Sequence, residues 1–301
     1  MAMRVTLACC LATLISSLTG CGGDGDGGGK TLDAQYQRAM KTADPTIRVT
    51  QLLGVAEKQI GAGDQAGAER SLGSAAATAK GMKDAKGKTA ALNRVAAALA
   101  KMQRPGEAKK LLREVSKTAE QIEDAESRVS TLTRMAYTYG KYLDEMDVAA
   151  SYLQTCAETA EQVTRPEGKV DAMLGVAYTY YGLAMSDKAQ SQLDRALSAA
   201  RALEDTRKQA DSLASAGAML CKMKLTDDAK EVFKEAQDKA GEIDDPLSQA
   251  YALVHLGQKL KEAGLNSAGQ KILQHAEEVA DTVTDQSMRG PLMDKIYAAR
   301  K

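Results

Sequence analysis

The sequence is poor in aromatic residues and in histidine. It contains no Trp, one Phe (Phe233) and two His (His255 and His275), and aromatic residues make up 4% of its 301 residues. Buried sheets favour β-branched and aromatic side chains, whereas closely packed helices accept small ones. The scarcity of aromatic residues, together with abundant Ala, therefore predicts an all-α protein.

Neither sign of charge is in excess. Lys and Arg together number 40, Asp and Glu together number 40, and the formal net charge is +0 at pH 7. This balance removes any argument from bulk charge for nucleic acid or an anionic membrane surface as the main partner. We expect no nucleic-acid partner.

The sequence also lacks the patterns of metal, nucleotide and catalytic sites. The two histidines are not spaced as ligands on one helix face. No glycine-rich phosphate loop follows a predicted strand, and no base stands beside a nucleophile. We expect no metal, no cofactor apart from a covalent lipid, and no enzymatic activity.

No hydrophobic run is long enough to span a membrane. The longest, from Val5 to about Ile15, falls short of the roughly 20 residues that a spanning helix needs. It follows the basic Arg4 and precedes the small residues Ser16, Ser17, Thr19 and Gly20. This order is typical of an export signal, so residues 1–20 are interpreted as a signal peptide.

The segment Leu18-Thr19-Gly20-Cys21 resembles the lipobox of bacterial lipoproteins. The resemblance implies cleavage before Cys21, attachment of acyl chains such as palmitate to Cys21, and a membrane anchor. Gly22 follows where lipoproteins retained at the inner membrane usually carry Asp, which implies an outer-membrane protein that faces the periplasm. The alternative is an ordinary secretory signal with a Cys near its end.

Residues 21–30 contain the lipidated Cys and a glycine-rich tether. The run GGDGDGGG after Cys21 is predicted to form neither a helix nor a core, because Gly loses too much backbone freedom on folding. As a flexible coil these eight residues reach on the order of 15 Å. The tether would hold a folded domain clear of the lipid headgroups.

The rest of the chain, residues 31–301, repeats itself about every forty residues. In each copy a large apolar residue is followed four positions later by a small one, as at Leu52 and Ala56, which predicts one face of a helix. Another small residue twelve positions further on, as at Ala68, predicts the start of a second helix. The copies begin near Asp44, Asp84, Asp124, Arg165, Asp205 and Asp245, and half-copies stand at both ends.

These spacings resemble the tetratricopeptide repeat. The resemblance covers residues from about 44 to 301 and implies a right-handed α-solenoid of antiparallel helical hairpins whose first helices line a concave groove. The copies depart from the family in lacking Trp and in being longer than its usual thirty-four residues. Asp44 and its counterparts predict helix caps, and Gly63, Pro105-Gly106 and Gly264 predict turns within hairpins.

Two cysteines remain for the mature domain, Cys156 and Cys221. They fall in different repeats and on different kinds of helix. A disulfide needs the two Cα atoms within about 7 Å, so we expect free thiols.

By this register, several tyrosines and lysines of the first helices face the groove. The sequence Ala-Tyr-Thr-Tyr occurs at 136–139 and at 177–180, and its first Tyr faces the groove while Tyr139 and Tyr180 face the core. Amphipathic rings are typical of peptide-binding surfaces. The candidate groove residues are Tyr137, Tyr178, Tyr181, Tyr251, Lys101, Lys141, Lys222 and Asn93. The alternative is that these tyrosines only fill gaps and that these lysines are solvated.

Family members that grip a C-terminal carboxylate use two Lys and two Asn on their first helices. Only Asn93 stands at a comparable place here, so the resemblance does not predict that binding mode. The sequence instead predicts a membrane-anchored scaffold that binds a partner protein or peptide in the concave groove.

Two rival functions remain open. One is a self-associating spacer of the cell envelope, which would use an apolar end surface formed by Met288, Leu292, Met293, Ile296 and Tyr297. The other is an enzyme in which Tyr178, Lys141 and carboxylates would converge in the groove.

Overall fold

A computed structural model describes residues 27–301, and within that range every regular element is a helix. The predicted signal peptide, the lipidation site at Cys21 and residues 21–26 of the tether lie outside the described residues. The prediction that the glycine run forms no helix was wrong for its last residues, because α1 already begins at Gly27. None of the helices in residues 27–301 combines the length and the apolar content needed to cross a membrane.

The helices form two alternating sets. The first helices of the repeats are α2 (Pro45–Gly61), α4 (Ala85–Lys101), α6 (Ala125–Tyr142), α8 (Pro166–Gly182), α10 (Thr206–Lys222), α12 (Pro246–Glu262) and α14 (Gln286–Arg300). The second helices are α1 (Gly27–Lys41), α3 (Gln65–Lys80), α5 (Pro105–Ala119), α7 (Met146–Ala160), α9 (Ser186–Arg201), α11 (Thr226–Gly241) and α13 (Asn266–Ala280). Each first helix from α2 to α12 packs most extensively on the second helix that follows it.

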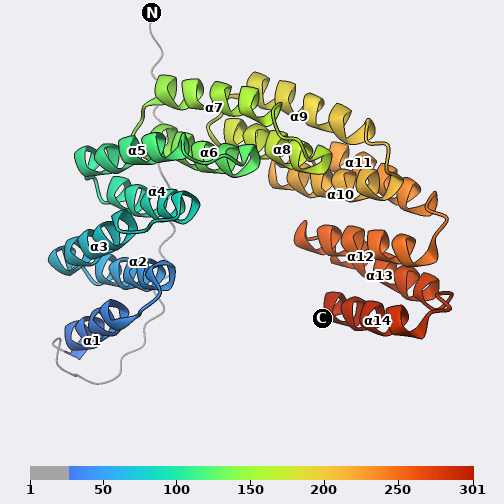
Figure 1. Cartoon of the computed structure of the whole chain (residues 1–301), viewed down its shortest axis with the longest axis horizontal. Coiled ribbons are helices and arrows are strands. Elements are labelled where there is room, and N and C mark those ends of the chain that lie inside the picture. The colour runs from blue at the N-terminus through green and yellow to red at the C-terminus, as the bar shows by residue number, and fades with distance from the viewer. Residues whose placement is uncertain (1–26) are drawn as a thin grey trace, which may run out of the picture.

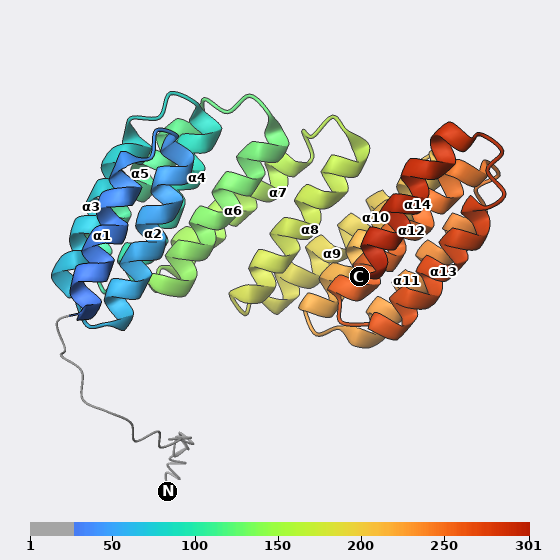
Figure 2. The same ribbon diagram turned by 90° about the horizontal axis from the view of Figure 1, so that it is seen from below.

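The paired helices stack into an arch (Figure 1). First helices of neighbouring repeats pack directly on one another, as α4 does on α6 and α10 on α12. Figure 2 looks up into the arch and shows the first helices following one another along its concave side. The chain is an all-helical α-solenoid, as the sequence predicted, with its first helices inside the curve.

Aspartate caps fix where most first helices begin. Each first helix from α2 to α12 starts one residue after a predicted repeat start. The Asp44 carboxylate accepts bonds from the backbone N–H groups of Thr46 and Ile47, at 2.8 and 2.9 Å. Equivalent caps stand at Asp84, Asp124, Asp205, Asp245 and Asp285. Arg165 makes no such bond and instead pairs with Glu126 at 2.8 Å.

The second helices begin earlier than predicted. α3 starts at Gln65, three residues before Ala68, and the other second helices of the six repeats show the same offset. The first turn of each is mostly exposed. The prediction relied on buried positions, so it placed the start of each second helix about one turn too late.

In the turn inside each hairpin, the residue at one equivalent position has a positive φ, in the left-handed region. Gly63 and Gly264 hold this position with φ of 77° and 81°, as their predicted role requires. The intervening repeats place non-glycine residues there: Gln103, Asp144, Ala184 and Lys224. The prediction of a turn at Pro105-Gly106 was wrong, because Pro105 occupies the first position of α5, where its missing N–H costs nothing.

A ladder of large and small side chains forms the core. The apolar residues that define the first helices are buried, and Leu52, Leu92, Leu213 and Leu253 are at most 1% exposed. Cys156 belongs to this core, and burial raises the pKa of its thiol to about 12. Cys156 and Cys221 are both free thiols.

A tyrosine-lined pocket on the concave face

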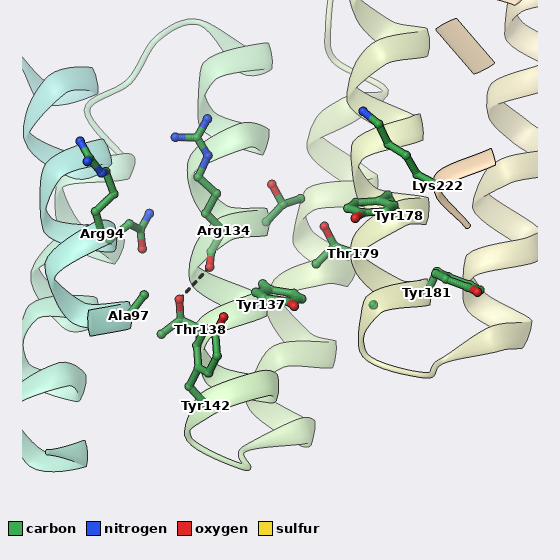
Figure 3. A pocket seen from close by; sticks show the side chains of 13 residues that line it. Arg94, Ala97, Arg134, Tyr137, Thr138, Tyr142, Tyr178, Thr179, Tyr181 and Lys222 are labelled. Atoms are coloured by element: carbon green, nitrogen blue, oxygen red, sulfur yellow. Dashed lines mark hydrogen bonds between the residues drawn. The ribbon is translucent and has the colours of Figure 1, made fainter. Parts of the chain in front are cut away.

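A large hollow lies on the concave face and crosses four first helices, α4, α6, α8 and α10. Its volume is about 580 Å³. Its lining comprises Asn93, Arg94, Ala97, Thr133, Arg134, Tyr137, Thr138, Tyr142, Tyr178, Thr179, Tyr181, Gly182 and Lys222. Figure 3 shows that these side chains come from consecutive repeats, so stacking of the repeats creates the site.

Tyrosine rings form the apolar part of the pocket. The rings of Tyr137 and Tyr142 meet edge to face, with centroids 5.9 Å apart and an interplanar angle of 86°. Tyr137 also packs against Gly182, where a Cβ atom would lie 3.2 Å from the Tyr137 ring. Burial is the main cause that raises the pKa of Tyr137, and the neighbouring Tyr142 and Tyr178 raise it further. This phenol therefore stays neutral at physiological pH and can donate a hydrogen bond.

The repeated Ala-Tyr-Thr-Tyr segment divides its two tyrosines between groove and core. Tyr178 is 42% exposed in the pocket, whereas Tyr180, two residues later, is 4% exposed. Tyr139 is likewise buried and stacks on Tyr152, with centroids 5.8 Å apart. The helical register predicted this division.

The pocket lining carries positive charge and no carboxylate. Arg94 donates from Nη1 to the hydroxyl of Thr50 at 2.8 Å. Within residues 27–301, neither Arg94, Arg134 nor Lys222 forms an ion pair with Asp or Glu. Arg94 and Arg134 are exposed. The pocket therefore presents guanidinium and ammonium groups beside an aromatic wall.

Asn93 adds a polar atom without a partner. Its side chain is 3% exposed and lines the pocket. Its Nδ2 donates to the backbone carbonyl of Thr131 at 3.1 Å, while its Oδ1 has no hydrogen-bond partner among the described residues. Because an unpaired buried acceptor costs roughly 1–3 kcal/mol, Asn93 is a polar group that a ligand or water could satisfy.

The structure brings together five of the eight predicted groove residues, namely Asn93, Tyr137, Tyr178, Tyr181 and Lys222. Lys101 lies at the margin, with its Nζ 5.1 Å from the centre of the Tyr142 ring.

Two predicted residues lie outside the pocket. Lys141 is exposed and absent from its lining. Tyr251 belongs to another part of the array, where Arg207 and Lys295 approach its ring at 5.3 and 5.1 Å.

Sequence reasoning missed Arg94, Arg134 and Tyr142. The two arginines occupy the same position of consecutive repeats, forty residues apart, and that recurrence was a signal that could have identified them. Tyr142 lies at the end of α6, next to the one-residue insertion of its repeat, where the pattern loses its register.

Carboxylates mark the concave face beyond the pocket. Asp171 precedes Tyr178 by seven residues on α8, which places the two about 10 Å apart along the helix axis. Removal of water by the surrounding protein raises the pKa of Asp171 and raises that of Asp211, on α10, to about 6. Within residues 27–301, no group of three or more His, Cys, Asp or Glu side chains is placed to hold a metal ion.

Comparison with known proteins gives no functional assignment. No protein-family model and no curated protein matches the sequence. Among solved structures, the chain is similar to the crystal structure of Ton1535 from Thermococcus onnurineus NA1, with a TM-score of 0.43 and 14% sequence identity. That alignment covers 89% of this chain and 98% of Ton1535. At this level of similarity it carries no argument about function.

Proposed function

We propose that the chain is a membrane-anchored, tetratricopeptide-like scaffold that binds an extended segment of a partner protein in the tyrosine-lined pocket. The observation that carries the proposal is the convergence of Tyr137, Tyr142, Tyr178 and Tyr181 from neighbouring repeats on one hollow of the concave face. Tyr is enriched at protein interfaces because its ring offers apolar area and its hydroxyl offers a hydrogen bond.

The size of the pocket fits a few side chains of a partner. A volume of about 580 Å³ lies in the range of sites that enclose most of a small ligand, and the lining combines apolar walls with few polar groups. An extended segment that crosses α4, α6 and α8 would place successive side chains in this space. Rigid helices on either side reduce the ordering cost of binding.

The N-terminal sequence supports the anchored part of the proposal. The lipobox-like segment ending at Cys21 would attach acyl chains, each buried methylene contributing about 0.8 kcal/mol, so several chains would hold the protein on the membrane. Residues 22–26 would connect this anchor to α1. We place the scaffold at the outer membrane, facing the periplasm.

The rival spacer function loses most of its support. Of the five residues expected to form an apolar end surface, Leu292 and Ile296 are fully buried and Met293 is partly buried. Of the five, only Met288 and Tyr297 are about half exposed, and the Tyr297 hydroxyl donates to Glu277 at 3.2 Å. Two scattered side chains are too little for a hydrophobic interface.

The rival enzymatic function requires Tyr178 and Lys141 to converge. Tyr178 lines the pocket and Lys141 does not. The pocket lining also includes no carboxylate or histidine that could act as a general base. Binding is therefore the better-supported proposal.

Photo-crosslinking in the native host tests the proposal. A photoreactive residue replaces Tyr178 in one variant and Ser191 in another, since Ser191 is exposed on α9, a second helix on the convex side. We expect a discrete adduct from position 178 alone, and its loss when Tyr137 and Tyr181 are changed to Ala. Equal background from both positions would reject the groove as the binding site.

A further inference from the structure

We infer that the pocket selects partner segments in which an Asp or Glu side chain lies within two residues of a large apolar side chain. The inference rests on the proposed function, because it concerns the same pocket. It adds the chemistry of the ligand, which follows from how charged and aromatic groups are distributed in the pocket lining.

The cations of the pocket lack the carboxylate partners that several other arginines have. Arg104 pairs with Glu69 at 3.0 Å, and Arg201 pairs with Glu235 at 2.9 Å, whereas the exposed Arg113 of α5 has no ion pair among the described residues. Arg94 and Arg134 have no carboxylate partner within residues 27–301, although both stand on the face where a partner would dock. Each guanidinium carries five N–H donors, and among residues 27–301 only one donor of Arg94 and none of Arg134 has a hydrogen-bond partner. A carboxylate is the group that such a planar fork binds most strongly.

The aromatic wall lies within reach of the same ligand. Arg134 and Tyr137 are three residues apart on α6, which separates them by roughly 4.5 Å along the helix axis. Figure 3 shows Arg94 and Arg134 beside each other and the rings of Tyr137 and Tyr178 further along the pocket. In an extended segment, side chains two residues apart project to the same side at about 7 Å. One carboxylate and one apolar side chain at that spacing fit both parts of the pocket.

The carboxylates beyond the pocket limit where the acidic residue can lie. Asp171 is about 10 Å from Tyr178 along α8, and Asp211 lies on the neighbouring α10. Both repel an anionic side chain at that end of the concave face. Lys222 is the one cation that α10 contributes to the lining, whereas α4 and α6 contribute Arg94 and Arg134. The acidic residue is therefore favoured in the part of the pocket formed by α4 and α6, by repulsion at the other end as well as by attraction.

Selection from a display library of random twelve-residue peptides tests the inference on the full-length protein. The wild type is compared with Arg94→Glu/Arg134→Glu and with the control Arg113→Glu, an exposed arginine of the second helix α5. Retained helix content and an unchanged unfolding midpoint show that each variant folds.

We expect the wild type and Arg113→Glu to enrich peptides with Asp or Glu within two residues of an apolar residue. The double variant should lose that enrichment, and fluorescence polarisation with the most enriched peptide should show at least roughly tenfold weaker binding. Enrichment of neutral or basic peptides by the wild type would overturn the inference and leave the proposed function standing. An absence of any enrichment would also overturn it, and crosslinking from position 178 decides the proposed function separately.

Discussion

The ring of Phe233 on α11 occupies the space that a side chain at Gly217 on α10 would need. A Cβ atom built at Gly217 would lie 2.8 Å from Cδ1 of Phe233. In the first four repeats the equivalent pair is an Ala that faces a Leu, as at Ala56 and Leu72. Both of those residues are buried. The sizes of the two facing side chains are therefore matched in the first five hairpins, whereas in the sixth Gly257 faces Leu273.

The change Gly217→Ala should lower the free energy of unfolding by about 1–3 kcal/mol, because overpacking forces the Phe233 ring or the backbone to move. Adding Phe233→Leu should restore most of the loss by reproducing the pair found in other repeats. Urea unfolding followed by circular dichroism measures both effects. The control is Gly54→Ala, since no atom lies within 4 Å of the added Cβ. That variant should be more stable by roughly 0.5–1 kcal/mol.

If Gly217→Ala proved as stable as Gly54→Ala, matching of the two side chains would not govern this hairpin. A double variant no more stable than Gly217→Ala alone would have the same meaning.

Replacement of Ala184 by Gly should stabilise the fold. Ala184 adopts φ of 58°, a left-handed conformation that costs a residue with a Cβ about 1–2 kcal/mol, while the added flexibility of Gly costs roughly 0.5–1 kcal/mol. A net gain of about 0.5–1 kcal/mol in the free energy of unfolding is expected. Ala202, which is exposed with φ of −85°, is the matched control, and Ala202→Gly should destabilise. Equal effects at the two alanines would contradict the prediction.

The two tyrosines of the second Ala-Tyr-Thr-Tyr segment should respond differently to truncation. Tyr180 is buried, so Tyr180→Ala should cost about 3–5 kcal/mol through the cavity it leaves. Tyr178 is 42% exposed, and Tyr178→Ala should change stability by less than about 1 kcal/mol while abolishing the crosslinks from neighbouring pocket positions. Thermal unfolding midpoints of the two variants decide the matter, and similar losses would argue that Tyr178 is a packing residue.

The stability of the protein should respond to pH through Asp211. Burial is the main cause that raises the pKa of this carboxyl from 3.8 to about 6 in the folded state. A carboxyl whose pKa is raised on folding destabilises the fold when ionised, so its cost is complete above pH 6 and disappears as the pH falls toward 4. The side chain is 33% exposed and lies 3.9 Å from Arg207, which reduces the expected cost at pH 7 to about 1 kcal/mol.

Accordingly, Asp211→Asn should raise the free energy of unfolding by about 1 kcal/mol at pH 7 and change it little at pH 4. Parallel stability curves for the wild type and the variant across this range would exclude a raised pKa. Asp187→Asn, at an exposed position of α9, serves as the control.

The sequence was sufficient to predict the solenoid because its buried positions recur. A small residue such as Ala56 and a large one such as Leu72 are both required at fixed spacing for two helices to approach, and every repeat must meet that requirement. The turn at Pro105 was mispredicted because Pro and Gly favour turns in general, whereas here the left-handed position falls on Gln103.

The candidate site was less predictable for a physical reason. Groove residues need not recur in every repeat, since they bind something outside the repeat. Tyr251 lies on the same face of its helix as Tyr178 does, but in another part of the array, away from the pocket. Arg94 and Arg134 come together through the stacking of α4 on α6, and neither repeat alone indicates a shared site.

Because the first helices pack along the concave side of the arch, the width of the pocket depends on the curvature of the arch. Its walls belong to α4, α6, α8 and α10, so any flattening of the array separates Arg94 from Lys222 and widens the space between them. A segment bound across these helices would stabilise the curved form of the array, because flattening would break some of its contacts. By reciprocity, tension that straightens the array would loosen the bound segment, and the protein would couple mechanical load to partner release.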